Sequence, residues 1–292
     1  MVGMRGWWQD LTDLVLPADC AGCGAPRTVL CPRCRAMLEG RVARRVRPVP
    51  EPAGLPVVHA VAPYAAEVRT LLLAHKERGA LALAGTLGAA LAAAVRAGLR
   101  GQAAGGGPGG RPRRGPVLLV PVPSARWAVR ARGHDPVRRM ALAAARELRR
   151  TGTPARVAPV LRQRRAVADQ AGLDARRRLE NLAGALEVTA GGGRLLGAGR
   201  VVLVDDLMTT GASLAEAARA LRAATVSRLD GRTAVYAAVT REGRGERRNG
   251  ARAEERKWVL GAPEMVVPNA PGRLLHAAVV AAPWDSFEMN RN

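Results

Sequence analysis

The sequence predicts an α/β protein in which helices flank a parallel sheet and a small cysteine-rich module precedes that sheet. From residue 116 onward, short apolar segments alternate with helical ones, which is typical of a parallel sheet with crossover helices. Ahead of that region, all four cysteines of the chain fall within residues 20–34, in two Cys-x-x-Cys pairs. A chain of 292 residues can bury a sizeable core, in one or two domains.

The composition is that of a folded protein without a membrane span. Hydrophobic residues make up 48% of the chain, but no run of 18 apolar residues occurs. The N-terminus lacks a basic segment that leads into an uninterrupted apolar one. We therefore expect a cytoplasmic protein.

The formal net charge of +22 invites a nucleic-acid interpretation, because clustered cations release counterions from a phosphate backbone. The basic residues are nearly all arginine, with lysine only at 76 and 257, and this usage beside abundant Ala and Gly also follows from a GC-rich genome. Only 3% of the residues are aromatic, which weakens a role in stacking on single strands. The charge leaves two interpretations open: a nucleic-acid surface, or a solvated surface with a few phosphate-binding arginines.

Residues 1–45 form the first predicted unit, an N-terminal helix and a module built on four cysteines. Apolar residues of 7–16 have amphipathic helical spacing, and we expect them to pack against the next domain. The two cysteine pairs bring four thiolates within reach of one tetrahedral ion, which favours structural Zn²⁺ in a zinc-ribbon-like module. A disulfide suits a chain without a secretion signal poorly, and a redox dithiol needs only one pair. The predicted ligands are Cys20, Cys23, Cys31 and Cys34.

An Arg/Pro-rich stretch at 41–56 is predicted to be a linker, and residues 57–100 to form a strand and helices of a hood or sheet edge. The predicted elements are a strand at Val57–Tyr64, a helix around Glu67–Ala74 and a long Ala/Leu helix from about Leu81 to Leu99.

Lys76 lies between these two helices, in a chain that otherwise uses arginine. A compact ammonium at this place is a candidate for binding a diphosphate, and a surface lysine at a helix end is the alternative. Residues 101–116 contain Gly, Pro and Arg without core-forming residues, so they are predicted to be a flexible linker.

Residues 117–240 are predicted to form the core of the α/β fold. The predicted strands are Val117–Val122, Asn181–Val188, Val201–Val204 and Thr233–Thr240. Arginines around Gly133 follow the first strand, within a loop at Pro123–Pro136, and precede a helix that reaches about Arg150; this place suits an anion. Residues 241–292 open with a charged run, and their apolar segments at 258–267 and 274–280 are either added elements or a partner-binding tail.

The most informative stretch is Val201–Ser213, where a buried strand ends in two carboxylates and a Thr-Thr-Gly turn. A helix begins there, and Ser213 with Glu216 fits a capping box. Backbone N–H groups, hydroxyls and the positive end of the helix dipole favour a phosphate at this turn. At least one of the two carboxylates should face the crevice, because successive strand residues point to opposite faces. Carboxylates next to a phosphate site can accept hydrogen bonds from the two hydroxyls of a diol, and a ligand with a phosphate and a diol is ribose 5-phosphate.

This string closely resembles the phosphoribosyl-diphosphate (PRPP) motif of type I phosphoribosyltransferases. The resemblance implies that Asp205 and Asp206 bind the ribose hydroxyls at the catalytic centre and support Mg²⁺. It also implies a loop that wraps the 5-phosphate, formed by Thr209, Thr210, Gly211, Ala212 and Ser213. The diphosphate-binding candidates are Lys76, Arg130, Arg132 and Gly133. The polar stretch at 159–181 matches in position the flexible loop that closes over PRPP, with Gln170, Arg176 and Arg177 as candidates.

The order of the motifs narrows the resemblance to the ComF family, competence-associated phosphoribosyltransferase-like proteins with an N-terminal zinc module. The matching features run from the cysteine pairs through Lys76-x-x-Gly79 and Val120-Pro121-Val122-Pro123 to the PRPP string, roughly residues 14–240. The chain departs from the family's usual pattern at two places. Glu77 stands in place of an aromatic residue, and Arg132-Gly133-His134-Asp135-Pro136 in place of Arg-Gly-Phe-Asn-Gln.

Two classes of function follow from this resemblance. As an enzyme, the chain would bind PRPP or a nucleotide with Mg²⁺ and transfer phosphoribosyl to an acceptor. As a non-enzyme, it would be a competence or DNA-uptake factor that binds single-stranded DNA. The sequence identifies neither a base-recognising group nor the oligomeric state.

Overall fold

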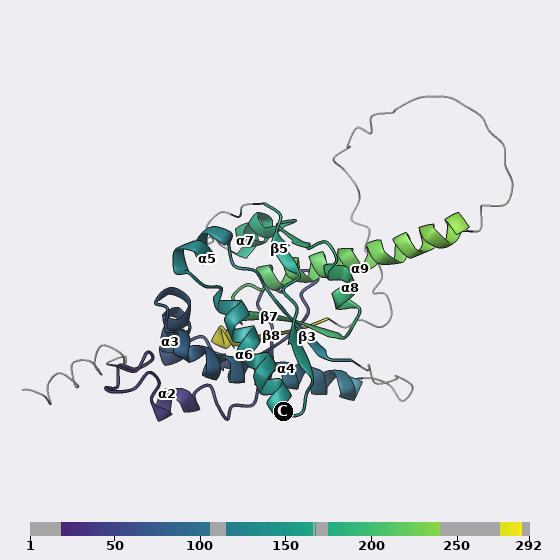
Figure 1. Ribbon diagram of the computed structural model, residues 1–292. Coiled ribbons are helices and arrows are strands. Elements are labelled where there is room, and N and C mark those ends of the chain that lie inside the picture. The colour runs from purple at the N-terminus through teal and green to yellow at the C-terminus, as the bar shows by residue number, and fades with distance from the viewer. Residues whose placement is uncertain (1–18, 106–114, 166, 168–174, 240–274, 288–292) are drawn as a thin grey trace, which may run out of the picture.

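The structure is a computed structural model that describes residues 19–105, 115–165, 167, 175–239 and 275–287 (Figure 1). Its centre is a six-stranded sheet in the order β1-β2-β8-β7-β3-β4, in which every neighbouring pair is parallel except β1 with β2. The strands are β1 (Arg44–Val46), β2 (Val57–Pro63), β3 (Val117–Pro121), β4 (Ala155–Val157), β7 (Arg200–Leu207) and β8 (His276–Ala282). The predicted α/β class with a mostly parallel sheet is confirmed.

Helices flank this sheet, and a separate antiparallel pair of strands lies beside it. The helices are α2 (Pro32–Ala36), α3 (Ala66–Glu77), α4 (Ala84–Gly105), α5 (Arg126–Arg132), α6 (Pro136–Arg150), α7 (Ala175–Leu182), α8 (Gly192–Leu196) and α9 (Ala212–Val239), with 3-10 turns at Leu81–Leu83 and Trp284–Ser286. The separate pair consists of β5 (Leu161–Gln163) and β6 (Leu186–Val188).

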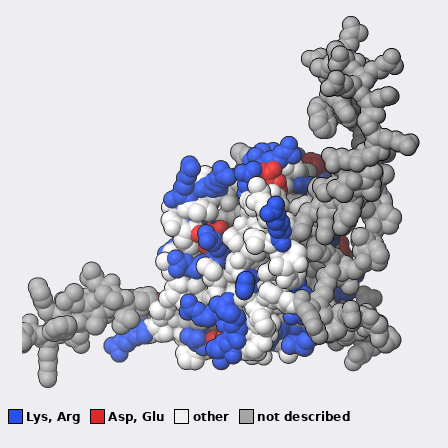
Figure 2. All heavy atoms as spheres, turned by 45° about the vertical axis from the view of Figure 1, so that its right-hand side comes forward, with Lys and Arg blue, Asp and Glu red and all other residues white. Residues whose placement is uncertain are grey.

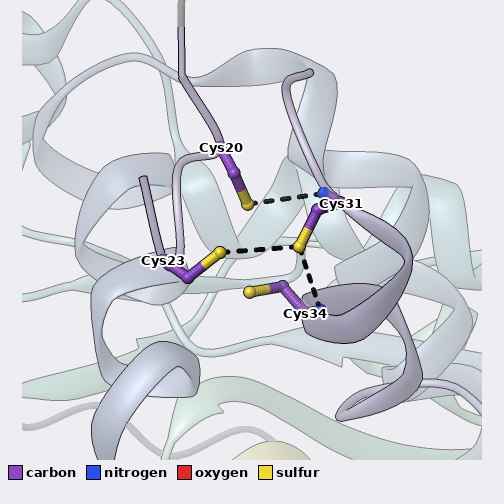
Figure 3. Close-up of side chains that lie close together, drawn as sticks. All are labelled: Cys20, Cys23, Cys31 and Cys34. Atoms are coloured by element: carbon purple, nitrogen blue, oxygen red, sulfur yellow. Dashed lines mark hydrogen bonds between the residues drawn. The ribbon is translucent and has the colours of Figure 1, made fainter. Parts of the chain in front are cut away.

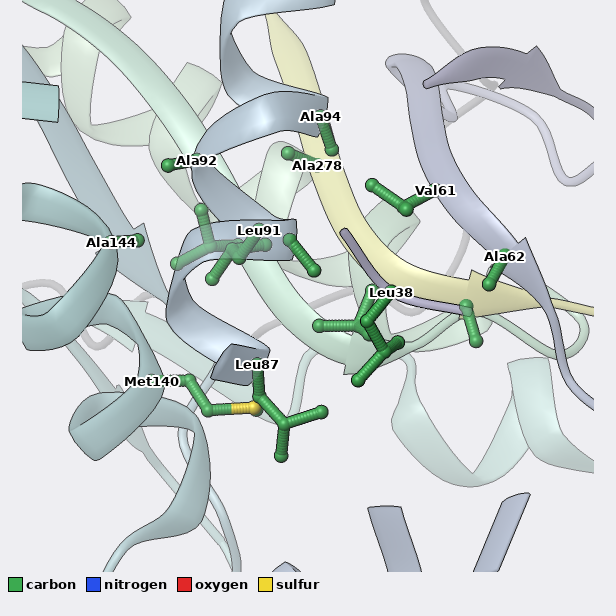
Figure 4. Packing of buried hydrophobic residues seen from close by; sticks show 14 of the residues in the cluster. Leu38, Val61, Ala62, Leu87, Leu91, Ala92, Ala94, Met140, Ala144 and Ala278 are labelled. Carbon is green, nitrogen blue, oxygen red and sulfur yellow. The ribbon is translucent and has the colours of Figure 1, made fainter. Parts of the chain in front are cut away.

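Each face of the sheet buries its own apolar cluster. On one face, Leu87 and Leu91 of α4 lie beside Met140 and Ala144 of α6, with Ala278 of β8 nearby (Figure 4). On the other face, the first half of α9 packs on the strands; its contributions include Leu214, Ala217, Ala218 and Leu221. Because both faces are covered, the central strands are buried along their length, as β8 is at all seven residues.

The largest difference from the sequence-based prediction is β8, which comes from the segment expected to be an added element or a tail. It lies between β2 and β7, in the middle of the sheet, and pairs in parallel with both. Its sequence, His-Ala-Ala-Val-Val-Ala-Ala, carries too little alternation to mark a strand, because both of its faces are buried. The α/β core therefore extends beyond the predicted limit of residue 240.

The strand predicted at Thr233–Thr240 is wrong, because α9 continues through this stretch to Val239. A short apolar run does not distinguish a strand from a helix by its period alone. The sequence also overestimated the irregular segments. The 41–56 stretch contains β1, the Pro123–Pro136 loop contains α5, and residues 101–105 continue α4.

The predicted flexible stretch at 159–181 contains β5 and most of α7. The predicted strand at Asn181–Val188 shortens to β6 and joins β5 instead of the main sheet. The amphipathic segment at 7–16 lies outside the described residues.

One helical stretch in the described part of the chain, Leu81–Gln102, is long and apolar enough by length and composition to cross a membrane. In its most apolar window, 61% is buried inside the protein. It includes most of α4, which packs against α6 and the sheet, so this burial is that of the core helix of a globular domain.

Candidate functional site

The four predicted metal ligands come together in the N-terminal module. The sulfur atoms of Cys20, Cys23, Cys31 and Cys34 all lie within 4.8 Å of one another (Figure 3). Four thiolates around one Zn²⁺ at about 2.3 Å would lie about 3.8 Å apart, so the cluster fits a tetrahedral ion. The cysteines form no disulfide. The module therefore presents four closely spaced thiols that could hold a metal ion such as zinc.

Local geometry explains why this short sequence gathers its sulfur atoms. The Cys31 sulfur accepts from the Cys34 backbone N–H over 3.4 Å, and the Cys20 sulfur from the Cys31 N–H over 3.4 Å. Gly22 leaves room for the cluster, because a Cβ there would lie 2.8 Å from the Cys34 sulfur. Burial raises the pKa of the Cys34 thiol; at Cys20 backbone N–H groups outweigh burial and lower the thiol pKa to about 6.

The module packs onto the main domain. Cys20, Cys34 and Leu38 belong to the same apolar cluster as Leu71 of α3 and Leu87 of α4. The described module thus adds its buried residues to the core of the domain.

At the carboxyl edge of the sheet, β7 ends in the two predicted carboxylates. Asp205 is 9% exposed and Asp206 6% exposed. Asp206 lies on the α3 side, where its Oδ2 is 3.1 Å from the Lys76 ammonium. Asp205 lines a small hollow with the loop at 207–214, and its Oδ1 accepts from the Asp206 N–H over 2.8 Å. The two carboxyl groups remain neighbours, and the Lys76 ammonium interacts with both, most strongly with Asp206.

Burial raises the pKa of the Asp205 carboxyl well above its ordinary value, and neighbouring Asp206 raises it further. The pKa of the Lys76 ammonium is raised chiefly by Asp206, against the effect of burial. The structure thus brings the Lys76 ammonium to the carboxylate pair, and diphosphate binding by Lys76 stays a prediction.

The predicted phosphate loop connects β7 to α9. Thr209 is exposed, and Thr210 and Ser213 are partly exposed. Gly211 has φ +76°, and a Cβ there would lie 3.0 Å from the Leu55 side chain, so glycine is favoured at this turn. Thr209, Thr210, Ala212 and Ser213 line the same small hollow at the start of a long helix, and the Ala212 N–H donates to the Thr210 hydroxyl over 3.5 Å.

The predicted capping box is wrong. The Glu216 carboxylate accepts instead from the Leu186 N–H of β6, over 2.9 Å, and pairs with Arg219. Glu216 therefore connects α9 to β6. Its carboxylate does not occupy the N–H groups at the start of α9.

Of the diphosphate candidates on or after α5, Arg132 contacts α3, whereas Arg130 and Gly133 are exposed. Nε and Nη2 of Arg132 donate to the two carboxylate oxygens of Glu77, each over 2.8 Å. Gly133 ends α5 with φ +73°, and Arg130 is exposed. His134 lies with Nδ1 3.1 Å from the Arg132 carbonyl and Nε2 3.1 Å from the His75 carbonyl.

The Arg-rich stretch brings a different arginine to the loop from those predicted. Arg178 of α7 donates from Nη1 to the Thr209 hydroxyl over 3.4 Å. Arg176 and Arg177 are exposed, and Arg176 pairs with Glu180 on its own helix. Gln170 lies outside the described residues.

A wider hollow of about 740 Å³ runs along α3, lined by residues that include Glu67, Thr70, Leu73, Glu77 and Arg78. It lacks the buried carboxylates and hydroxyl-bearing turn of the sheet edge, so we place the candidate site at the smaller hollow.

The sequence did not indicate that Glu77 pairs with Arg132 or that Arg178 contacts the loop. The sequence singled out Glu77 only because it stands, next to Lys76, where the resembled family usually has an aromatic residue. Three consecutive arginines gave no signal as to which one faces the loop. The chain matches no protein-family model, and no curated protein matches its sequence.

Proposed function

We propose that this protein binds PRPP or a nucleotide at the carboxyl edge of its sheet and acts as a phosphoribosyltransferase-like protein of the ComF kind. The observation that carries the proposal is the pair of buried carboxylates at the end of β7, directly before a hydroxyl-bearing turn at the start of α9. In open α/β sheets, ligands bind at the carboxyl ends of the strands. The order of strand, carboxylates, turn and helix supports a type I phosphoribosyltransferase fold.

Each group has a defined role in this proposal. The turn N–H groups and the hydroxyls of Thr209, Thr210 and Ser213 donate to the 5-phosphate. Asp205, which lines the hollow, accepts from a ribose hydroxyl. Lys76 and Asp206 form the boundary of the site toward α3. Transfer of phosphoribosyl to an acceptor would then depend on positioning and on neutralising the departing diphosphate.

Mg²⁺ would accompany the ligand in this proposal. Carboxylate oxygens suit this cation, and Asp205 and Asp206 supply them at the right edge of the sheet. Asp206 already faces Lys76, so most of the cation's ligands would come from the substrate's own oxygens and water. When bound, Mg²⁺ would neutralise phosphate charge.

The test is calorimetric titration of PRPP with Mg²⁺ into the parent and into Asp205→Asn/Asp206→Asn protein. Each lost charged hydrogen bond is worth about 1.5–3 kcal/mol, so affinity should fall about tenfold to a hundredfold. Melting temperature should change little, because the variant loses the Lys76 pair and also the repulsion between two carboxylates. Diphosphate release across a panel of bases tests transfer. Equal affinities in the parent and the variant would refute the proposal.

We also propose that the cysteine cluster holds one structural Zn²⁺. Four thiolates without a nearby His favour this ion and leave no open position. Protein purified without chelator should contain about one zinc per chain, and Cys23→Ser should lower that content. A metal-free parent that melts at the same temperature as the purified protein would refute a structural role.

A second candidate function is binding of single-stranded DNA, and an exposed tryptophan favours it. Trp127 on α5 is 62% exposed, and Arg130, three residues on, lies on the same helix face. Figure 2 shows Lys and Arg side chains in several clusters over one side of the molecule, with few acidic groups among them. An aromatic face beside arginines is suited to stacking on a base.

This second function is tested by fluorescence anisotropy with a labelled single-stranded oligonucleotide. Loss of one stacked base costs about 1–3 kcal/mol, so Trp127→Ala should weaken binding about tenfold. Trp284→Ala is the matched control, since Trp284 is 69% exposed and lies outside α5. Equal losses in both variants would reject α5 as the binding surface.

A further inference from the structure

We infer that Glu77 sets the ligand preference of this site: by neutralising Arg132, it removes the advantage that PRPP would otherwise have over a ligand with a single phosphate on ribose. Ribose 5-phosphate and nucleoside 5′-monophosphates are ligands of this class. The inference rests on the proposed function, because it names which phosphate-bearing ligand the same site prefers.

The site has a loop end, at the β7–α9 turn, and an α3 end, and the cationic side chains at these two ends have different hydrogen-bond partners. At the loop end, Arg178 donates to the Thr209 hydroxyl and, within the part of the chain that the structure describes, contacts no carboxylate. Its Nε is buried without a hydrogen-bond partner there. A buried donor of this kind is satisfied when an anion or water arrives. The loop end therefore keeps donors available for one phosphate.

At the α3 end, both cations already face carboxylates. Lys76 lies 3.1 Å from Asp206, and Arg132 makes a bidentate pair with Glu77. Bidentate guanidinium–carboxylate pairs have the same fork geometry that would bind a phosphate group. Glu77 thus occupies the two Arg132 donors that a diphosphate would need.

The Arg132–Glu77 pair is supported from both sides. The Arg132 side chain is only 17% exposed, so the guanidinium has little freedom to leave the carboxylate. His134 lies between the carbonyls of Arg132 and His75 and joins the end of α5 to the end of α3. The surroundings therefore hold the Arg132 guanidinium, whereas the Glu77 carboxylate, at 46% exposed, is the accessible partner of the pair.

A diphosphate that entered the α3 end would have to displace Glu77 or lie next to it. Displacement breaks two charge-assisted hydrogen bonds, and coexistence places like charges close together. A ligand with only the 5-phosphate meets neither obstacle. The diphosphate at C1 of PRPP therefore adds little affinity in the parent protein.

The experiment is calorimetric titration with ribose 5-phosphate and with PRPP, both with Mg²⁺, into the parent and Glu77→Gln protein. In the parent, the two affinities should agree within about threefold. Glu77→Gln should raise PRPP affinity about tenfold and leave ribose 5-phosphate unchanged, since a neutral amide releases the guanidinium. In that background, Arg132→Gln should remove the gain.

Glu39→Gln is the matched control. Glu39 is 42% exposed and pairs with Arg35 over 3.0 Å, whereas Glu77 is 46% exposed and pairs with Arg132 over 2.8 Å.

The outcomes separate this inference from the proposed function. PRPP binding at least tenfold tighter than ribose 5-phosphate in the parent would overturn the inference and keep the function. Unchanged PRPP affinity in Glu77→Gln protein would also overturn it. Failure of the parent to bind either ligand would overturn both.

Discussion

The two edges of the sheet bury ionisable side chains in opposite ways. At the carboxyl edge, Asp205 and Asp206 share their surroundings with Lys76, so opposite charges meet. Near the amino edge, His59 and His276 stack with their ring centroids 6.2 Å apart beneath Gly98 of α4, where a Cβ would lie 3.4 Å from Nδ1 of each ring. Burial, with smaller contributions from His59 and Arg45, lowers the pKa of His276 to about 4.

The contrast shows that buried side chains carry charge at the carboxyl edge and stay neutral at the amino edge. A buried charge is costly unless it is paired, and the carboxyl edge meets this condition through the Lys76–Asp206 ion pair, beside the loop of the proposed ligand site. The amino edge keeps His276 neutral at neutral pH, which avoids that cost. Charge at the carboxyl edge can therefore serve binding, whereas at the amino edge it only destabilises the fold.

The largest effect is expected at the amino edge, in acid. Because the pKa of His276 is lower in the folded than in the unfolded chain, the unfolded chain binds an extra proton below about pH 6.5, and stability falls with pH from there to about 4. Between pH 7 and pH 5 this loss is about 2 kcal/mol. Urea unfolding at both pH values should show a smaller loss in His276→Leu than in the parent. Equal losses would remove the contrast between the edges.

At the carboxyl edge, Asp206→Asn should cost about 1 kcal/mol, because Lys76 loses its carboxylate but remains partly exposed to screening water. The same unfolding measurement at pH 7 checks this value. An unchanged or higher stability would mean that the Lys76–Asp206 pair does not support the fold.

The smallest effect is expected for Asp205→Asn. The raised pKa of Asp205 means that its ionised form destabilises the folded state as pH rises, so removing the charge should add up to about 1 kcal/mol at pH 7 and nothing near pH 4. The asparagine oxygen can still accept from the Asp206 N–H. A gain that persists at pH 4 would point to a cause other than charge.

The sequence predicted what is encoded locally. The cysteine cluster follows from two short spacings, and β7 with its turn follows from one continuous string. The sheet around them was predicted only in part. β8 was missed because a fully buried Ala-rich strand has no alternating pattern, and α9 was cut short because the apolar run at 233–239 has no clear period.

The sequence predicted those residues of the candidate site that lie on one continuous segment. It did not predict the contacts between residues far apart in the chain. Glu77 and Arg132 are 55 residues apart, and only the packing of α5 on the end of α3 makes them a pair. Arg178 rather than its two predecessors faces Thr209 because of the rotation of α7, which a run of three arginines does not reveal.

The most direct test of the central claim, that the β7–α9 turn binds a ribose phosphate, is calorimetric titration of ribose 5-phosphate into the parent, Gly211→Ala and Gly152→Ala proteins. Both glycines have positive φ. A Cβ at Gly211 would lie 3.0 Å from the Leu55 side chain, whereas no atom lies within 4 Å of a Cβ at Gly152. We predict that the parent binds, that Gly211→Ala weakens binding at least about tenfold, and that Gly152→Ala does not. A parent that does not bind, or equal affinities for parent and Gly211→Ala, would contradict the claim.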